Sequence, residues 1–165
     1  MKSNIVLTGF MGTGKSTVGR LVAELLRRPF VDCDEFIVQR AGKSIARLFA
    51  EEGEEHFRRL EREVCAELAA QQGQVIATGG GALLDPRNRE ALARQGLLVC
   101  LMATPDSIRA RLARECGRPL FNGAWEALYQ ERLATYAAMT HQLVTDDRAP
   151  QDVAQEVVSL WRAYS

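Results

Sequence analysis

The amino-acid sequence predicts an α/β fold in which a parallel sheet of about five strands is covered by helices on both faces. Short apolar segments, typical of buried parallel strands, alternate with longer segments whose apolar residues recur at helical spacing. Glycine-rich or acidic motifs directly follow three of the apolar segments. The chain has 165 residues, which is enough for one such sheet with its helices, so we expect a single domain over residues 1–165.

The N-terminal part of the chain contains two strand–helix units. Residues 4–8 form a short apolar run and predict the first strand. Apolar residues at helical spacing then predict a helix over about residues 16–28. The apolar residues 29–31 predict a second strand, which leads through two aspartates into a helix over about residues 35–40.

The central part is the most charged region and is predicted to be mainly helical. Ser44 is a suitable N-cap for a helix over residues 45–50, and Gly53 is expected to separate it from a longer helix over residues 54–72. Residues 75–78 then predict a third buried strand, which ends in three glycines.

The C-terminal part continues the same alternation. Pro86 is suited to open a helix, because proline is favoured at the first helical position. Further helices are expected over about residues 105–114, up to about residue 139 and after Pro150, and strands over residues 97–102 and 142–145. Ligands bind at the carboxyl ends of the strands in such sheets, so we expect the motifs that follow strands to meet at one edge.

The composition favours a small charged ligand over a large nucleic-acid surface. The chain has 21 basic and 21 acidic side chains and a formal net charge of zero, so we expect no nucleic-acid partner. The four cysteines have no C-x-x-C spacing, which predicts free thiols in a cytoplasmic protein. No apolar run approaches membrane-spanning length and the first strand starts close to the N-terminus, so we expect neither a membrane contact nor a signal peptide.

The segment Gly9-Phe10-Met11-Gly12-Thr13-Gly14-Lys15-Ser16 fits the P-loop pattern G-x-x-x-x-G-K-[ST]. In this motif backbone N–H groups surround an anion, the lysine reaches the β- and γ-phosphates, and the serine hydroxyl serves Mg²⁺. A strand precedes the motif and a helix follows it, which argues against a chance glycine-rich turn. We therefore expect an ATP phosphate site formed by Gly12, Thr13, Gly14, Lys15, Ser16 and Thr17.

Two carboxylates follow the second strand. Asp32 is a candidate to complete a Mg²⁺ site with Ser16, directly or through a water molecule, because Mg²⁺ is commonly bound through one or two carboxylates. Asp34 points to the same side if the backbone stays extended, and is a candidate to accept or orient the proton of an attacking hydroxyl. The alternative is that one caps a helix and the other is a solvated turn residue.

Arg58 and Glu61 lie three residues apart on one face of a predicted helix. Glu61 is positioned to hold Arg58 in one rotamer, and an arginine so held presents a planar fork to a carboxylate. The alternative is an ordinary solvated helix face with weak ion pairs, and this helix taken alone favours that alternative.

The three glycines Gly79, Gly80 and Gly81 suggest close approach of a ligand, although a plain strand-to-helix turn explains one or two of them. Arg118 lies in a segment rich in turn residues and is a candidate to close over phosphates, although a loop arginine is usually only solvated. These two motifs complete the set of candidate ligand contacts.

Taken in order, the P-loop, Asp32-Cys33-Asp34, Phe57-Arg58-Arg59-Leu60-Glu61, Gly79-Gly80-Gly81 and Arg118-Pro119-Leu120 resemble the successive motifs of shikimate kinases. The resemblance spans nearly the whole chain. It implies a nucleoside-monophosphate-kinase-like P-loop fold with a five-stranded parallel sheet. It also implies transfer of the γ-phosphoryl group of ATP to the 3-hydroxyl of shikimate, with Mg²⁺ as cofactor.

The same resemblance implies a role for each matching residue. Asp34 contacts the shikimate hydroxyls, Arg58 and Arg132 bind its carboxylate, and Gly79, Gly80 and Gly81 lie against the ring. Lys15 and Arg118 stabilise charge on the transferred group, Ser16 and Asp32 serve the metal, and Arg111, Arg148 and Pro150 flank adenine. It further implies a substrate-binding helical region over about residues 34–62 and a lid over about residues 112–124, in an enzyme that we expect to be a monomer.

Two other functions remain open from the sequence. A kinase for another small hydroxy acid, such as gluconate, would also use arginines for a carboxylate. The segment between Arg118 and Arg132 is short for a lid, which makes a nucleotide-binding regulator without catalytic activity a second alternative. Acceptor-dependent phosphoryl transfer distinguishes the regulator from both kinases, and a panel of acceptors distinguishes the kinases from each other.

Overall fold

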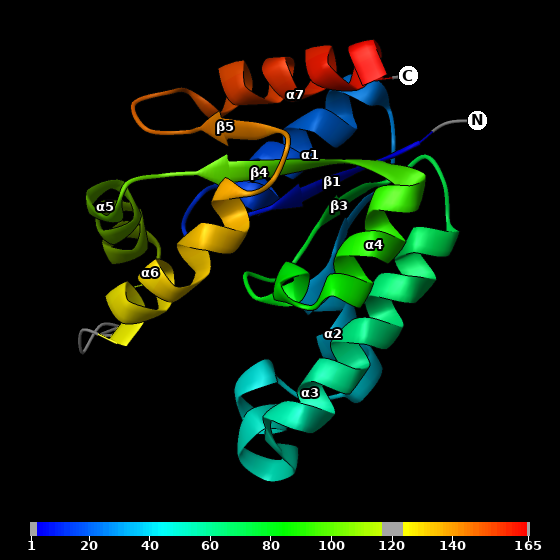
Figure 1. Cartoon of the computed structure of the whole chain (residues 1–165), viewed down its shortest axis with the longest axis vertical. Coiled ribbons are helices and arrows are strands. Elements are labelled where there is room, and N and C mark those ends of the chain that lie inside the picture. The colour runs from blue at the N-terminus through cyan, green and yellow to red at the C-terminus, as the bar shows by residue number, and fades with distance from the viewer. Residues whose placement is uncertain (1–2, 117–123, 165) are drawn as a thin grey trace.

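The computed structural model describes residues 3–116 and 124–164 and has the predicted α/β architecture (Figure 1). Five parallel strands form one sheet in the order β2-β3-β1-β4-β5. The strands are β1 (Asn4–Thr8), β2 (Phe30–Asp32), β3 (Val75–Ala77), β4 (Gly96–Met102) and β5 (Gln142–Val144).

Helices follow the strands in the expected alternation. They are α1 (Lys15–Leu26), α2 (Cys33–Ala41), α3 (Ile45–Ala70), α4 (Pro86–Gln95), α5 (Pro105–Cys116), α6 (Ala124–Ala137) and α7 (Pro150–Tyr164). A short 3₁₀ helix, η1 (Ala82–Leu84), was not expected from the sequence.

The central strand divides the core between the two faces of the sheet. Ile5 and Leu7 are fully buried on the face covered by α1 and α7, whereas Val6 is buried on the face that α3 and α4 cover (Figure 1). Successive residues of a strand point to opposite faces, so a continuous apolar run is needed when both faces are covered. This arrangement explains why the run at residues 4–8 does not alternate with polar residues.

The local signals at the start of α3 are confirmed. The Ser44 hydroxyl accepts a hydrogen bond from the backbone N–H of Arg47 at 3.2 Å, which is the geometry of an N-cap. Gly53 has φ 83° and ψ 168°, a conformation that only glycine adopts readily, and it interrupts the helix at the predicted residue.

The prediction of free thiols is confirmed for the cysteines whose side chains the structure describes. Cys33, Cys65 and Cys100 are buried and free, whereas the side chain of Cys116 lies outside the described part of the chain. Within residues 3–116 and 124–164, no helix combines the length and the apolar character that a membrane crossing needs.

Candidate functional site

The P-loop connects β1 to α1 at the carboxyl edge of the sheet. Gly9 has φ 135°, and a Cβ atom on it would lie 2.3 Å from the carbonyl oxygen of Leu101 in β4. Only glycine fits so close to a neighbouring strand. The buried Thr13 hydroxyl donates to the carbonyl of Phe10 at 2.8 Å, which fixes the turn of the loop.

Lys15 is held against its own loop. Its ammonium group donates to the carbonyl oxygens of Gly9 and Phe10, each at 2.8 Å. Burial lowers the pKa of Lys15 from 10.5 to about 8, and the negative charges of Asp34 and Asp32 oppose this shift. The Lys15 ammonium group is therefore held by backbone acceptors of the P-loop itself.

The two carboxyl oxygens of Asp32 have different partners. Oδ1 accepts hydrogen bonds from the backbone N–H groups of Asp34 at 3.0 Å and Glu35 at 3.4 Å, so Asp32 caps α2. Oδ2 accepts a hydrogen bond from the Ser16 hydroxyl at 2.8 Å. The capping interpretation and the predicted proximity to Ser16 therefore both hold, each for a different oxygen.

The Ser16 and Asp32 oxygens suit Mg²⁺ chemically, because this ion prefers hard oxygen ligands and usually keeps phosphate and water ligands as well. No group of three or more His, Cys, Asp or Glu side chains that could hold a metal ion occurs in the described residues. A Mg²⁺ ion at this place would thus depend on nucleotide phosphates for the rest of its ligands.

The backbone at Asp34 is helical, and the expectation that it stays extended is wrong. The chain is not extended here, because α2 begins at Cys33 and places Asp34 in the first helical turn. Its half-buried carboxylate lies against Gly79, and a Cβ atom on that glycine would be 2.7 Å from Asp34 Oδ1. Burial and then the charge of Asp32 raise the pKa of Asp34, while Lys15 and Arg58 oppose the shift. The interpretation of Asp34 as a solvated turn residue is therefore wrong.

The glycine tripeptide after β3 is the point at which three candidate side chains meet. Asp34 of α2 lies against Gly79, as described. A Cβ atom on Gly80 would be 3.3 Å from Nη1 of Arg132 in α6. A Cβ atom on Gly81 would be 2.9 Å from Nη2 of Arg58 in α3 and 3.2 Å from Nη2 of Arg132. The absent side chains thus make room for one carboxylate and two guanidinium groups.

Arg58 is fixed by Glu61. Its Nη1 donates to Glu61 Oε1 at 2.7 Å, and the side chain of Glu61 is only 3% exposed. Burial raises the pKa of Glu61, and the hydrogen bond from Arg58 opposes this shift. The interpretation of this pair as an ordinary solvated helix face is therefore wrong.

Unlike Arg58, Arg132 makes no ion pair with a carboxylate among the described residues, although its charge acts to lower the pKa of Glu61. Its Nε atom is buried and has no hydrogen-bond partner among the described residues, and its guanidinium lies 5.8 Å from the centre of the Phe10 ring. Tyr136, one helical turn further along α6, is buried and donates a hydrogen bond from its hydroxyl to the Gly80 carbonyl. This contact was not expected from the sequence, although the i, i+4 spacing of Arg132 and Tyr136 on one helix face was a signal for it.

A cavity of about 300 Å³ adjoins the other side of the P-loop. Its lining includes Gly12, Thr17, Arg111, Arg148 and Pro150. The Arg111 guanidinium donates to the carbonyl of Gly12 at 3.1 Å and to the hydroxyl and carbonyl of Thr145 at 2.9 and 2.6 Å. Sequence reasoning missed Thr145, which follows β5 as the other site residues follow their strands. The three residues expected to flank adenine thus surround one cavity next to the phosphate loop.

One predicted catalytic residue cannot be placed. Arg118 and most of the expected lid, residues 117–123, lie outside the described residues.

Comparisons with known proteins identify the family of the chain. The family model described as Shikimate kinase matches residues 11–162. The chain is 49% identical to a shikimate kinase from Symbiobacterium thermophilum over 94% of both chains. It is 43% identical to one from Geobacter sulfurreducens, covering 98% of this chain and 92% of the other. A solved structure of shikimate kinase from Acinetobacter baumannii in complex with shikimate has a TM-score of 0.90 and 36% identity, and the match covers 100% of this chain and 96% of that chain.

Proposed function

The chain belongs to the shikimate kinase family, and we propose that it transfers the γ-phosphoryl group of ATP to the 3-hydroxyl of shikimate. The observation that carries the proposal is the meeting of Asp34, Arg58 and Arg132 on Gly79–Gly81, at the same sheet edge as the P-loop. This arrangement offers two cations for a carboxylate and one carboxylate for hydroxyl groups. Those are the polar groups of a small hydroxylated acid.

The acceptor half of the site binds and orients shikimate in this proposal. Arg58 and Arg132 bind the substrate carboxylate, and Glu61 keeps Arg58 in place. Asp34 accepts a hydrogen bond from the hydroxyl that attacks the phosphorus. Since the transition state of phosphoryl transfer is loose, holding this oxygen in line contributes more than removing its proton early. The glycines Gly79, Gly80 and Gly81 allow the ring to lie close to the backbone.

The donor half binds ATP and stabilises the charge that moves. The P-loop N–H groups of residues 12–17 hold the phosphates, and Lys15 moves from its backbone acceptors to the β- and γ-phosphate oxygens. Ser16 and Asp32 are the residues that would hold Mg²⁺, which supplies further neutralisation of phosphate charge when bound. Arg111, Arg148 and Pro150 surround adenine in the adjoining cavity.

Some parts of the proposal rest on the family resemblance alone. They are the charge-stabilising role of Arg118 and the lid over about residues 112–124, whereas the proposed substrate-binding region over about residues 34–62 contains Asp34 and Arg58, which approach the glycines. The active unit in this proposal is a monomer.

An assay of ADP release with shikimate as acceptor tests the proposal. We expect turnover that depends on both shikimate and Mg²⁺, with little ADP released when shikimate is absent. Gluconate serves as the alternative acceptor in the same assay. ATP binding without transfer to either acid would overturn the proposal in favour of a regulator, and faster turnover with gluconate would reassign the substrate.

The variant Asp34→Asn links the activity to this site. It keeps the size of the side chain and removes the acceptor charge, so we expect kcat to fall while ATP affinity is preserved. An unchanged kcat would show that Asp34 does not contact the reacting hydroxyl.

A further inference from the structure

A second cavity, of about 640 Å³, lies away from the proposed active site, beside the amino end of β4. The residues that begin β4, Gly96, Leu97 and Leu98, form part of its wall, whereas the P-loop and Gly79–Gly81 follow the carboxyl ends of their strands. Its volume falls within the range of small-molecule sites, about 300–1,000 Å³. The kinase reaction does not use this cavity.

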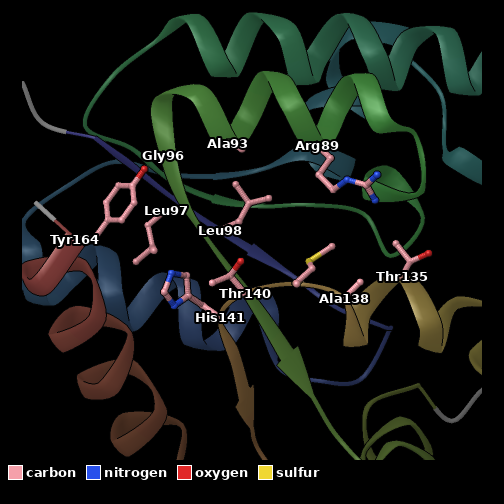
Figure 2. A pocket seen from close by; sticks show the side chains of 11 residues that line it. Arg89, Ala93, Gly96, Leu97, Leu98, Thr135, Ala138, Thr140, His141 and Tyr164 are labelled. Carbon is pink, nitrogen blue, oxygen red and sulfur yellow. The ribbon is translucent and has the colours of Figure 1, made fainter.

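The cavity is lined by segments that are distant in sequence. Figure 2 shows Ala93 and Arg89 of α4 above it, and Ala138, Thr140 and His141, which follow α6, below it. Arg89 and Thr135 lie towards one end in this view, and His141 and Tyr164 towards the other. An apolar middle with polar groups at both ends is the usual form of a site for a small organic ligand.

The charges of the cavity favour an anion. None of its eleven lining residues is acidic, and Arg89 is the one arginine among them. The hydrogen bond that Arg89 makes within the described residues is long, from Nη1 to the carbonyl of Leu83 at 3.4 Å. On the same helix, Arg87 instead has a carboxylate partner, Asp85, at 3.0 Å. Arg89 is therefore a half-buried cation whose remaining donors are available to a ligand carboxylate.

The carboxyl end of α6 does not cancel this preference. The last carbonyl groups of a helix carry partial negative charge, which would favour a cation. At the end of α6, however, the Gln142 side-chain amide donates to the carbonyls of Ala137 and Met139, each at 2.8 Å. These carbonyl groups are already hydrogen-bonded, which leaves the full charge of Arg89 as the dominant feature.

We propose that this cavity is a second ligand site, which binds a small carboxylate with an apolar body and is coupled through α6 to the shikimate site. The carboxylate pairs with Arg89 next to Thr135, and the apolar body packs over Leu98 and Met139. The ligand is of a different class from shikimate, because the middle of the cavity offers no polar partners for a ring of hydroxyl groups.

The coupling follows from the positions of residues along α6. Thr135 and Ala138 line the cavity, and Tyr136 between them donates its hydroxyl to Gly80. Arg132 lies three residues before Thr135 on the same helix and approaches Gly80 and Gly81. A ligand that displaces this part of α6 therefore moves one of the two arginines that we place on the shikimate carboxylate.

Binding is tested with 3-phenylpropionate as the probe and the neutral 3-phenylpropionamide as its matched control. We expect saturable NMR shifts of the Leu98, Ala138 and Thr140 backbone amides with the acid, and affinity weaker by about tenfold or more for the amide. Arg89→Gln should weaken binding of the acid by a similar factor. Arg94→Gln, an exposed arginine of α4 outside the cavity, should leave it unchanged.

Several outcomes would overturn the site. They are the absence of saturable shifts at the cavity residues, equal binding of acid and amide, and equal binding by wild type and Arg89→Gln. An unfolding temperature of Arg89→Gln close to that of wild type excludes loss of the fold as the cause of weaker binding. Ala138→Met provides a second variant, since the longer side chain fills the cavity without removing any charge.

Coupling is tested by titrating shikimate in the presence and absence of saturating 3-phenylpropionate. We expect a change in shikimate affinity of about fivefold or more, and an equal change in 3-phenylpropionate affinity when shikimate is saturating. Tyr136→Phe removes the hydrogen bond to Gly80 and should reduce this mutual effect. Binding of both ligands with independent affinities would overturn the coupling through α6.

Discussion

The donor and acceptor halves of the site are built in different ways. In the donor half, the phosphate cradle is formed by the backbone of one continuous segment, residues 9–17. The acceptor half takes Asp34 from α2, Arg58 from α3 and Arg132 from α6, and brings them together on the glycines after β3. The comparison teaches that phosphate binding is secured by local conformation, whereas recognition of the acceptor depends on the packing of three helices.

The two halves also differ in which protein groups hold their cations. The Lys15 ammonium group donates hydrogen bonds to backbone carbonyls of its own loop, and burial lowers its pKa to about 8. Arg58 is fixed by a buried carboxylate, while Arg132 lies beside Phe10 with its Nε unpartnered among the described residues. The donor cation must therefore exchange partners when ATP binds, whereas the acceptor cation Arg58 is already oriented.

Replacing the donor cation should give the largest effect. Lys15→Met keeps the length of the side chain but removes the charge that stabilises the moving phosphoryl group. We expect kcat to fall by about 10²–10³-fold, the usual loss for one donor to a transition-state oxyanion. Steady-state kinetics with saturating shikimate and ATP measure this change.

Lys43→Met is the matched control, because the ion pairs of Lys43 are with Glu51 and Glu52 on the surface of α3. It should leave kcat within about twofold, as expected for an exposed ion pair. A similar loss in both variants would mean that lysine removal acts on stability rather than on the donor half.

Removing either acceptor arginine should have a smaller and more selective effect. We expect Arg58→Ala and Arg132→Ala each to raise the KM for shikimate by about 30-fold, equivalent to about 2 kcal/mol for a charge-assisted hydrogen bond. The KM for ATP should stay close to that of wild type. Arg59→Ala, an exposed neighbour on α3, is the control.

The same two variants should differ in stability. Arg58→Ala leaves the buried Glu61 without its partner, so we expect the free energy of unfolding to fall by about 1–3 kcal/mol. Arg132→Ala leaves no such carboxylate and should change stability less. Denaturant unfolding measures both, and equal destabilisation would contradict the different roles that we assign to the two arginines.

The sequence predicted the donor half more completely than the acceptor half for a physical reason. Glycines, a lysine and a serine within eight residues determine a P-loop locally, as Gly53 locally determines the break in α3. The environment of Glu61 depends on packing against a glycine that lies 18 positions later, with its Oε2 at 3.4 Å from a Cβ on Gly79. Its spacing from Arg58 was visible in the sequence, but its burial was not.

The structure also changes the meaning of the three glycines. The sequence suggested that they admit a ligand, whereas the geometry shows that Gly79 and Gly81 first make room for Asp34 and Arg58. Periodicity within one segment cannot give such contacts between segments. The same limit applies to Tyr136, whose hydrogen bond crosses from α6 to the loop after β3.

Adding one methyl group to either of two glycines should separate the orientation of Asp34 from the binding of shikimate. In Gly79→Ala the new Cβ would lie 2.7 Å from Asp34 Oδ1, so Asp34 must move and we expect kcat to fall by about tenfold. In Gly80→Ala the Cβ meets the end of Arg132 at 3.3 Å, so we expect chiefly a higher KM for shikimate. Kinetics of both variants test this, and an effect of Gly79→Ala on KM alone would contradict the proposed position of Asp34.

The smallest expected effect is a pH dependence that belongs to the donor half alone. Lys15 in the ligand-free protein has a pKa of about 8, and only its protonated form attracts phosphate. We therefore expect kcat/KM for ATP to fall above this pH, by about fourfold at pH 8.5, because this parameter reports the free enzyme. Bound phosphate favours the charged lysine, so kcat should fall only at higher pH.

The sign of the shift also fixes the effect on stability. The unfolded chain keeps the Lys15 proton up to its ordinary pKa of 10.5, whereas the folded chain releases it near 8. Between these values the unfolded state binds more protons, so the contribution of Lys15 to the free energy of unfolding rises with pH. Tyr136 and Cys100 act in the opposite direction over the upper part of this window, because the unfolded chain releases their protons near 10 and 9, whereas burial raises the pKa of each to about 12 in the folded chain. The kinetic profiles identify the titrating group. If kcat and kcat/KM for ATP fell at the same pH, that group would not be a cation whose charged form is stabilised by bound ATP.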